Sequence, residues 1–308
     1  MFLLKAIKNL IFGTACCLTP FTAVIALGWL MRYMQSISFG RINNDHQEQT
    51  PIGWIMGPKS SGFVSRCFGG IWQNAMVGMG GTISLLLATL PFTGLWLLSW
   101  WAGWENSFNK GYEQAWVGPV VGFIGVAIGL WVLAHLPIGL AHQATENRWF
   151  ALFELRRVRQ FVGLAGWRYV ALSLATVLFA LPVFAARGLP VFIEGIVPGF
   201  SELPAQKVDQ IASVIALMKA GYVFVALVIL RRWSAQIYAD AVIRSGGNRP
   251  NTRTLGTRKA NWFLRTPHLI FMLIIWFGFV FLIFSGQFLN NSWLLWINHP
   301  FLVLPWLP

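Results

Sequence analysis

Apolar runs of about 20 residues recur along the chain and alternate with polar, mostly basic stretches. A helix needs about 20 apolar residues to cross the hydrocarbon core of a bilayer. The pattern therefore predicts an all-α fold, a polytopic transmembrane helical bundle in a single membrane domain over residues 1–308. About six spans are expected, at residues 9–31, 71–101, 115–141, 169–186, 210–230 and 267–286.

The first apolar segment allows two interpretations. Pro20 divides it into two pieces that are each too short to cross a bilayer. As a continuous span, the segment would place Lys5 and Lys8 on the outer side of the membrane. The positive-inside rule disfavours basic residues there. A re-entrant hairpin would keep both lysines inside, but its broken backbone would need protein cover. We favour the span and keep the hairpin as the alternative.

Composition supports a membrane protein. Of 308 residues, 56% are hydrophobic and 11% are charged, whereas soluble domains carry about 25% charged residues. This excludes a soluble globular protein, a disordered chain and a disulfide scaffold. Cys16 and Cys17 are adjacent and Cys67 stands alone, so neither a disulfide framework nor a zinc site is expected.

The basic residues are concentrated in three segments. Residues 32–70, 142–168 and 231–265 hold 17 of the 23 lysines and arginines and alternate with segments that hold one or two. The positive-inside rule predicts that these three segments are cytoplasmic. In such a chain the net charge of +13 indicates contact with anionic lipid headgroups rather than nucleic acid. The expected headgroup contacts are Arg156, Arg157, Arg159, Arg249, Arg253, Arg258 and Lys259.

Small residues line one face of the third predicted span. Spacings of four, three and four place Gly118, Gly122, Gly125 and Gly129 on the same side of a helix, where a second helix can approach closely. That helix could belong to a partner subunit or to this chain, and we favour packing within the chain. Residues 78–81 of the second span, with three glycines, are the expected complement.

Lys219 lies near the centre of the fifth predicted span. Charged residues at that depth are functional candidates by default, and Glu194, Glu202 or Asp209 are its possible partners. Alternatively, the fifth membrane segment starts later than predicted and the lysine reaches outward to the interface.

His135, His142 and Glu146 are spaced seven and four residues apart and would share a face of an unbroken helix. Pro137 interrupts that helix, and for a haem His268 is the plausible opposing ligand, so neither a metal site nor a haem is expected. No nucleophile, Walker or dinucleotide motif occurs. We therefore expect no catalytic activity and no cofactor other than bound lipids.

Residues 149–164 contain both aromatic side chains and arginines, and the apolar positions spread around a helical wheel. This predicts a short interfacial element that is not cleanly amphipathic. The preceding sequence, residues 141–154 (AHQATENRWFALFE), resembles a segment of uncharacterised bacterial polytopic membrane proteins, over about residues 135–185. The resemblance implies a bacterial inner-membrane location and no particular activity.

The tail, residues 287–308, has no charged side chain and contains Trp293, Trp296 and Trp306. Pro300 and Pro305 make a continuous span unfavourable, so the tail is expected at the outer interface, either on lipid or covering a neighbouring subunit.

The leading functional hypothesis is a non-catalytic accessory, scaffold or assembly subunit that docks on a larger membrane complex, with lipids and other membrane subunits as partners. It rests on the absent catalytic motifs, the tail and the glycine face. A transporter of a small or lipidic solute is the alternative. A haem- or quinone-binding redox subunit is a weaker one.

Overall fold

The computed structural model describes residues 2–43, 63–102, 116–196, 203–246, 262–287 and 297–307. Within these ranges the regular structure is entirely helical, so the predicted all-α fold is confirmed. Its elements are α1 (Phe2–Cys16), α2 (Pro20–Ile42), α3 (Phe63–Trp100), α5 (Val117–Leu133), α6 (Leu136–Glu146), the 3₁₀ helix η3 (Trp149–Phe153), α7 (Leu155–Ala165), α8 (Trp167–Ile196), α9 (Ala205–Arg244) and α10 (Trp262–Gln287).

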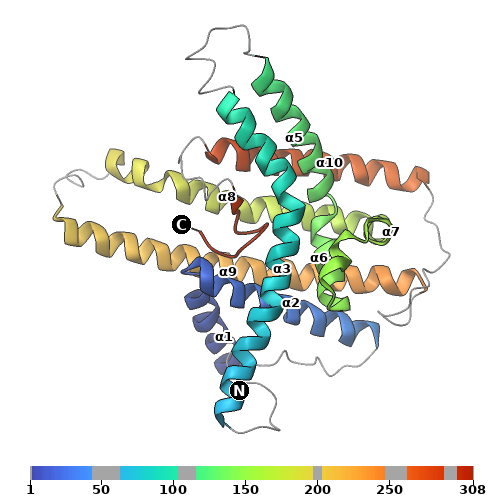
Figure 1. Cartoon of the computed structure of the whole chain (residues 1–308), viewed down its shortest axis with the longest axis horizontal. Coiled ribbons are helices and arrows are strands. Elements are labelled where there is room, and N and C mark those ends of the chain that lie inside the picture. Colours follow the sequence, from blue (N-terminus) through green and yellow to red (C-terminus); the bar gives the residue numbers. More distant parts are fainter. Residues whose placement is uncertain are drawn as a thin grey trace.

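Four segments of the described helices are long and apolar enough to cross a membrane: Phe68–Trp100, Trp167–Ala186, Ala205–Arg244 and Thr266–Ile283. A fifth span is obtained if α5 and α6 count as one, although they meet at 46°. In Figure 1, α3 and α5 run across the direction of α8, α9 and α10. The long helices therefore do not share a single axis.

The predicted first span, residues 9–31, is not one helix. The chain breaks between α1 and α2, where the Thr19 hydroxyl caps α2 by accepting from the Thr22 amide at 3.3 Å and Pro20 occupies the first turn. Helix α2 then continues to residue 42, into the segment expected to be a loop. Neither α1 nor α2 is long and apolar enough to count as a span.

Helix α2 is the central element, because it packs on α3, α6 and α9. It crosses α3 where Gly28 faces Asn74 and Gly78 faces Val24. A Cβ atom on either glycine would overlap the opposing backbone carbonyl. The glycines therefore permit a backbone-to-backbone approach that no larger residue allows. Beside the crossing, Arg32 donates to the Asn74 side chain at 2.9 Å.

Helix α7 corrects the expectation for residues 149–164. Its buried side chains, Val158, Phe161, Val162 and Ala165, follow the spacing of one helical face, so the helix is amphipathic. The helical-wheel prediction was wrong because it treated residues 149–164 as one helix. Residues 149–153 form a separate 3₁₀ helix, and Glu154 interrupts the helical register before α7 begins. Arg156 and Arg159 are exposed on its outer side.

The tail is also placed differently from its prediction. Residues 297–307 enter the centre of the molecule instead of lying at an outer interface (Figure 1). Phe301, Leu302 and Val303 are each at most 4% exposed and belong to the main hydrophobic core. The Asn298 side chain fixes the turn, donating to the Trp306 carbonyl at 2.9 Å and accepting from the Leu304 amide at 2.8 Å. Trp306 is half-buried, whereas Trp293 and Trp296 lie outside the described residues.

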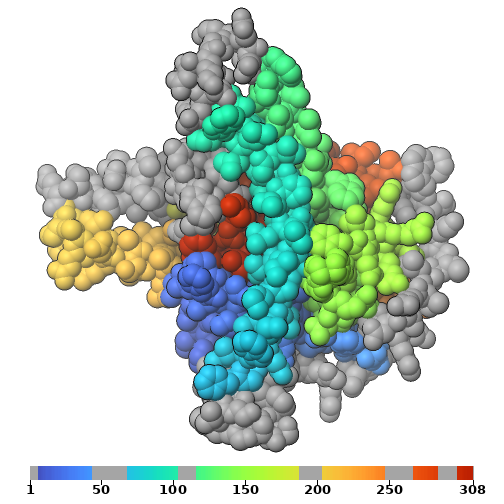
Figure 2. Space-filling view, viewed as in Figure 1, coloured from blue at the N-terminus to red at the C-terminus, as the bar shows by residue number. Residues whose placement is uncertain are grey.

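Many large apolar side chains point outward on the long helices. Trp72 of α3, Phe123 of α5 and Phe281 of α10 are each more than 60% exposed. Exposed large apolar side chains in this number fit contact with lipid. Figure 2 shows one face of the molecule, with α3 running down it beside the segment of η3 and α7.

Candidate functional site

The three predicted basic segments meet in the structure. Asp240 of α9 binds Arg41 of α2, with Nε and Oδ1 2.5 Å apart, and also forms an ion pair with Arg168 of α8. Nearby, Arg244 donates to the Leu164 carbonyl at 3.0 Å. Each residue belongs to one of the segments 32–70, 142–168 and 231–265. These contacts bring parts of all three segments together at one place in the molecule.

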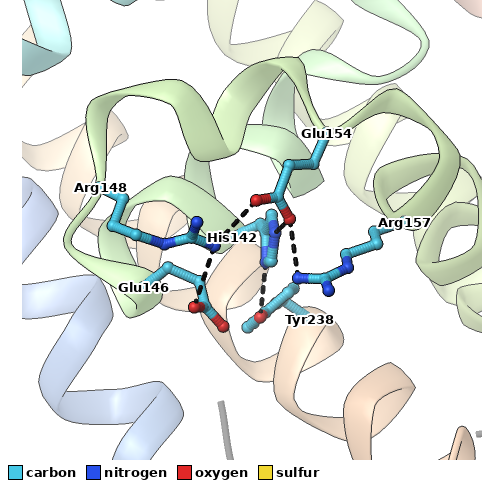
Figure 3. Close-up of polar contacts among 6 residues, drawn as sticks. All are labelled: His142, Glu146, Arg148, Glu154, Arg157 and Tyr238. Atoms are coloured by element: carbon cyan, nitrogen blue, oxygen red, sulfur yellow. Dashed lines mark hydrogen bonds and ion pairs between the residues drawn. The ribbon is translucent and has the colours of Figure 1, made fainter. Parts of the chain in front are cut away.

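A second group of polar residues lies at the same junction, and we call it the His142 network. It comprises His142, Glu146, Arg148, Glu154, Arg157 and Tyr238 (Figure 3). His142 and Tyr238 are almost fully buried, at 2% and 1% exposed. The network joins α6, α7 and α9 through side chains that are distant in sequence.

Glu154 is the centre of this network. Its carboxylate accepts from His142 Nε2 at 3.0 Å, from Arg148 at 2.8 Å and from Arg157 at 2.9 Å. Partial burial acts to raise the pKa of Glu154. The hydrogen bond from His142, together with the charges of the two arginines, outweighs it, so the pKa is lowered from its usual value. Glu154 is therefore an ionised acceptor at neutral pH.

The acceptor role of Glu154 determines the tautomer of His142. Nε2 must carry a proton to donate to the carboxylate, so in the neutral ring Nδ1 is the acceptor. The Tyr238 hydroxyl lies 2.9 Å from Nδ1 and donates to it. Both ring nitrogens are thus occupied and the tyrosine is buried. This arrangement supports a structural link between α6 and α9 rather than a nucleophile or base open to substrate.

A pocket opens next to the network, and Arg148 belongs to both. Its volume is about 500 Å³, within the range of about 300–1,000 Å³ typical of small-molecule sites. We call it the methionine pocket, because Met31 of α2 and Met76 and Met79 of α3 contribute to its wall. The other lining residues are Val77, Gly80, Gly81, Ile83, Gln143, Ala144, Asn147, Arg148 and Trp149.

The polar wall of the pocket is held by a chain of hydrogen bonds. Gln143, 2% exposed, donates from Nε2 to Ser84 Oγ at 2.9 Å. Ser84 Oγ lies 2.8 Å from the Gly80 carbonyl and 2.9 Å from the Trp149 carbonyl. Sequence reasoning did not select Gln143 or Ser84. The sequence feature that could have pointed to Gln143 is the polar run at residues 142–147, which follows an apolar helix.

The glycine face of α5 is covered from within the chain. Gly125 and Gly129 face the Trp96 ring of α3, and the Gly118 carbonyl accepts from Ser99 Oγ at 2.5 Å. A side chain on Gly122 would meet the same Ser99 hydroxyl. The expected complement at residues 78–81 is elsewhere. Gly78 and Gly81 face α2, and Gly80 lines the pocket.

The remaining candidates do not converge. His135 caps α6 and its Nδ1 lies 2.6 Å from the Trp131 carbonyl, whereas His142 and Glu146 belong to the network. Among the described residues, no group of three or more His, Cys, Asp or Glu side chains could hold a metal ion. His268 lies against the Trp167 ring.

Lys219 is half-buried on α9, which begins at residue 205, before the predicted start. Because α9 has 40 residues, twice the length that a bilayer crossing needs, the start of the helix does not test where the membrane-crossing part begins. Asp209 precedes Lys219 by ten residues on the same helix, about 15 Å along its axis, and cannot pair with it. Glu202, together with the basic residues Arg249, Arg253, Arg258 and Lys259, lies outside the described residues.

No family model matches the chain, and no match was found among curated proteins or solved structures. The functional argument therefore depends on the geometry of the chain itself.

Proposed function

We propose that this chain is a multi-pass membrane protein that binds a small or lipidic apolar solute in the methionine pocket. This is the transporter hypothesis reduced to its binding step. The observation that carries it is an open pocket of about 500 Å³, lined among others by Met76, Met79 and Ile83 of α3, which are exposed on the surface of the molecule. A solute could enter sideways from the lipid without passing through water. Methionine suits such a wall because its flexible thioether adapts to different shapes.

The accessory-subunit hypothesis has lost two of its three supports. The glycine face packs on α3, and the described part of the tail fills the chain's own core. The absence of catalytic motifs still fits it, but that absence fits a binding protein equally well. Docking on a larger complex therefore stays a prediction.

We also propose the bacterial inner membrane as the location, with the three basic segments on its cytoplasmic side. The support is the clustering of 17 basic residues in those segments and their mutual contacts through Asp240. The resemblance of residues 141–154 to bacterial membrane proteins points the same way.

A pocket-filling substitution tests the binding function. A Cβ atom on Gly80 would meet only the Cβ of Trp149, at 3.9 Å, so Gly80→Leu should extend into the cavity without striking backbone. Gly94 is on the same helix with open space around it, and Gly94→Leu is the matched control. The probe is a hexadecyl diazirine, photolysed with the protein in lipid nanodiscs and mapped by mass spectrometry.

Wild type and Gly94→Leu should carry the label on residues 76–83 and 143–149, and Gly80→Leu should lose it there. Equal labelling of these segments in all three proteins would contradict the proposal. Labelling spread evenly over the exposed apolar helices would contradict it too.

A further inference from the structure

The methionine pocket has one feature that a purely apolar ligand would not use. Gln143 lines the pocket and is 2% exposed, yet its Oε1 has no hydrogen-bond partner in the described structure. A buried amide oxygen without a donor carries a large desolvation penalty. Buried polar atoms without a hydrogen-bond partner are rare in folded proteins, so this one needs an explanation.

The orientation of this amide follows from its neighbours. Ser84 has a single hydroxyl proton, and two carbonyls, those of Gly80 and Trp149, lie within hydrogen-bond distance of it. The proton therefore goes to a carbonyl, and Ser84 can offer Gln143 only a lone pair. Gln143 must present its NH₂ group to Ser84. Its oxygen is left on the other branch of the amide, where it is covered and has no donor.

We propose that the ligand of the methionine pocket is a membrane amphiphile with one alkyl chain and a hydroxyl group. The hydroxyl donates a hydrogen bond to Gln143 Oε1. This inference rests on the proposed function. The chain lies among Met31, Met76 and Met79. These side chains rotate to admit the hydroxyl to the covered oxygen, since methionine has three soft torsions. The exposed flank of α3 assigns the bilayer as the source.

The charge around the pocket fits a neutral head. Arg148, at the rim, already pairs with Glu146 and Glu154. Its charge is therefore balanced, and an anionic head would have to compete with two carboxylates. A hydroxyl group needs only one hydrogen-bond acceptor, and Gln143 Oε1 provides it.

The test compares two competitors of the hexadecyl diazirine probe in nanodiscs: 1-hexadecanol and its methyl ether. They share the same alkyl chain, but only the alcohol can donate. In wild type the alcohol should displace the probe about tenfold better than the ether, the effect of one buried hydrogen bond. Gln143→Met should bind both alike, near the affinity of wild type for the ether. Ser84→Ala, which removes the group that fixes the amide, should reduce the preference without abolishing binding.

Three results overturn the proposal. Equal competition by alcohol and ether in wild type means that the amide oxygen plays no part, although the pocket still binds. An undiminished preference in Gln143→Met means that another group reads the hydroxyl. Failure of both competitors, with the wild-type protein folded, removes the proposed function together with this inference.

Discussion

Neutralising Glu154 is the sharpest test of the His142 network. In Glu154→Gln, the group facing His142 Nε2, Arg148 and Arg157 is an amide instead of a carboxylate. His142 is 2% exposed, so a weakened or lost partner for its buried N–H should cost about 1–3 kcal/mol. The side chain of Arg157 is 20% exposed and that of Arg148 is 51% exposed, so together they add about 1 kcal/mol after screening by solvent.

The expected total is about 2–4 kcal/mol, which lowers the midpoint of thermal unfolding by about 3–6 °C for a chain of this size. The measurement is intrinsic tryptophan fluorescence during heating in a fixed detergent. Arg156→Gln is the control, because Arg156 is exposed on α7, two residues away. A midpoint for Glu154→Gln equal to that of the control would refute the structural role of the network.

The pH dependence provides a second check on Glu154. Its pKa is lowered in the folded protein, so its stabilisation is complete above its unfolded pKa of about 4.3 and is lost as the pH falls through the lower folded value. The gap between wild type and Glu154→Gln should stay constant from neutral pH down to about 5 and narrow below about 4. A gap that narrows between pH 7 and 5 would show that a different group titrates.

Three further predictions concern packing and lipid contact. Gly28→Ala should lower the unfolding temperature sharply, because its Cβ overlaps the Asn74 carbonyl, whereas Gly94→Ala should not; similar midpoints would refute the α2–α3 crossing. Phe301→Ala should cost about 3–5 kcal/mol as a core truncation, measured by the same heating experiment; no loss would place the tail outside the core. Replacing Arg249, Arg253, Arg258 and Lys259 by Gln should weaken binding to anionic nanodiscs by about 1 kcal/mol per residue, most at low salt; salt-independent binding would argue against headgroup contact.

Hydropathy located the helices well but not their ends. The polar run after residue 31 suggested a loop, yet α2 continues to residue 42 and α9 continues past Arg231 to Arg244. Arginine and glutamine are good helix formers, so a change in polarity need not end a helix. The break before Pro20 and the break near Pro137 were visible in the sequence because proline marks a helix start.

The site depended on contacts that a single sequence does not encode locally. His142 and Glu146 were selected as polar residues beside a span, but their partner Tyr238 is 96 residues away from His142. The tail was misplaced for a related reason. Its apolar, proline-rich sequence fits an interface or an interior equally well. The Arg231 side chain that donates to its Phe301 carbonyl at 3.3 Å is 70 residues earlier in the chain.

The buried tail has a consequence for biosynthesis. Residues 297–307 follow every described helix in the chain, so the ribosome delivers all of those helices before it delivers the segment that fills their centre. Arg231 is 6% exposed in the complete protein and donates a hydrogen bond to the Phe301 carbonyl. A chain interrupted before residue 297 lacks this carbonyl, so the Arg231 side chain loses that hydrogen-bond acceptor. The core of the described helices is therefore complete only after this segment has been made. A chain that lacks the segment therefore differs from a complete one at the centre of the molecule.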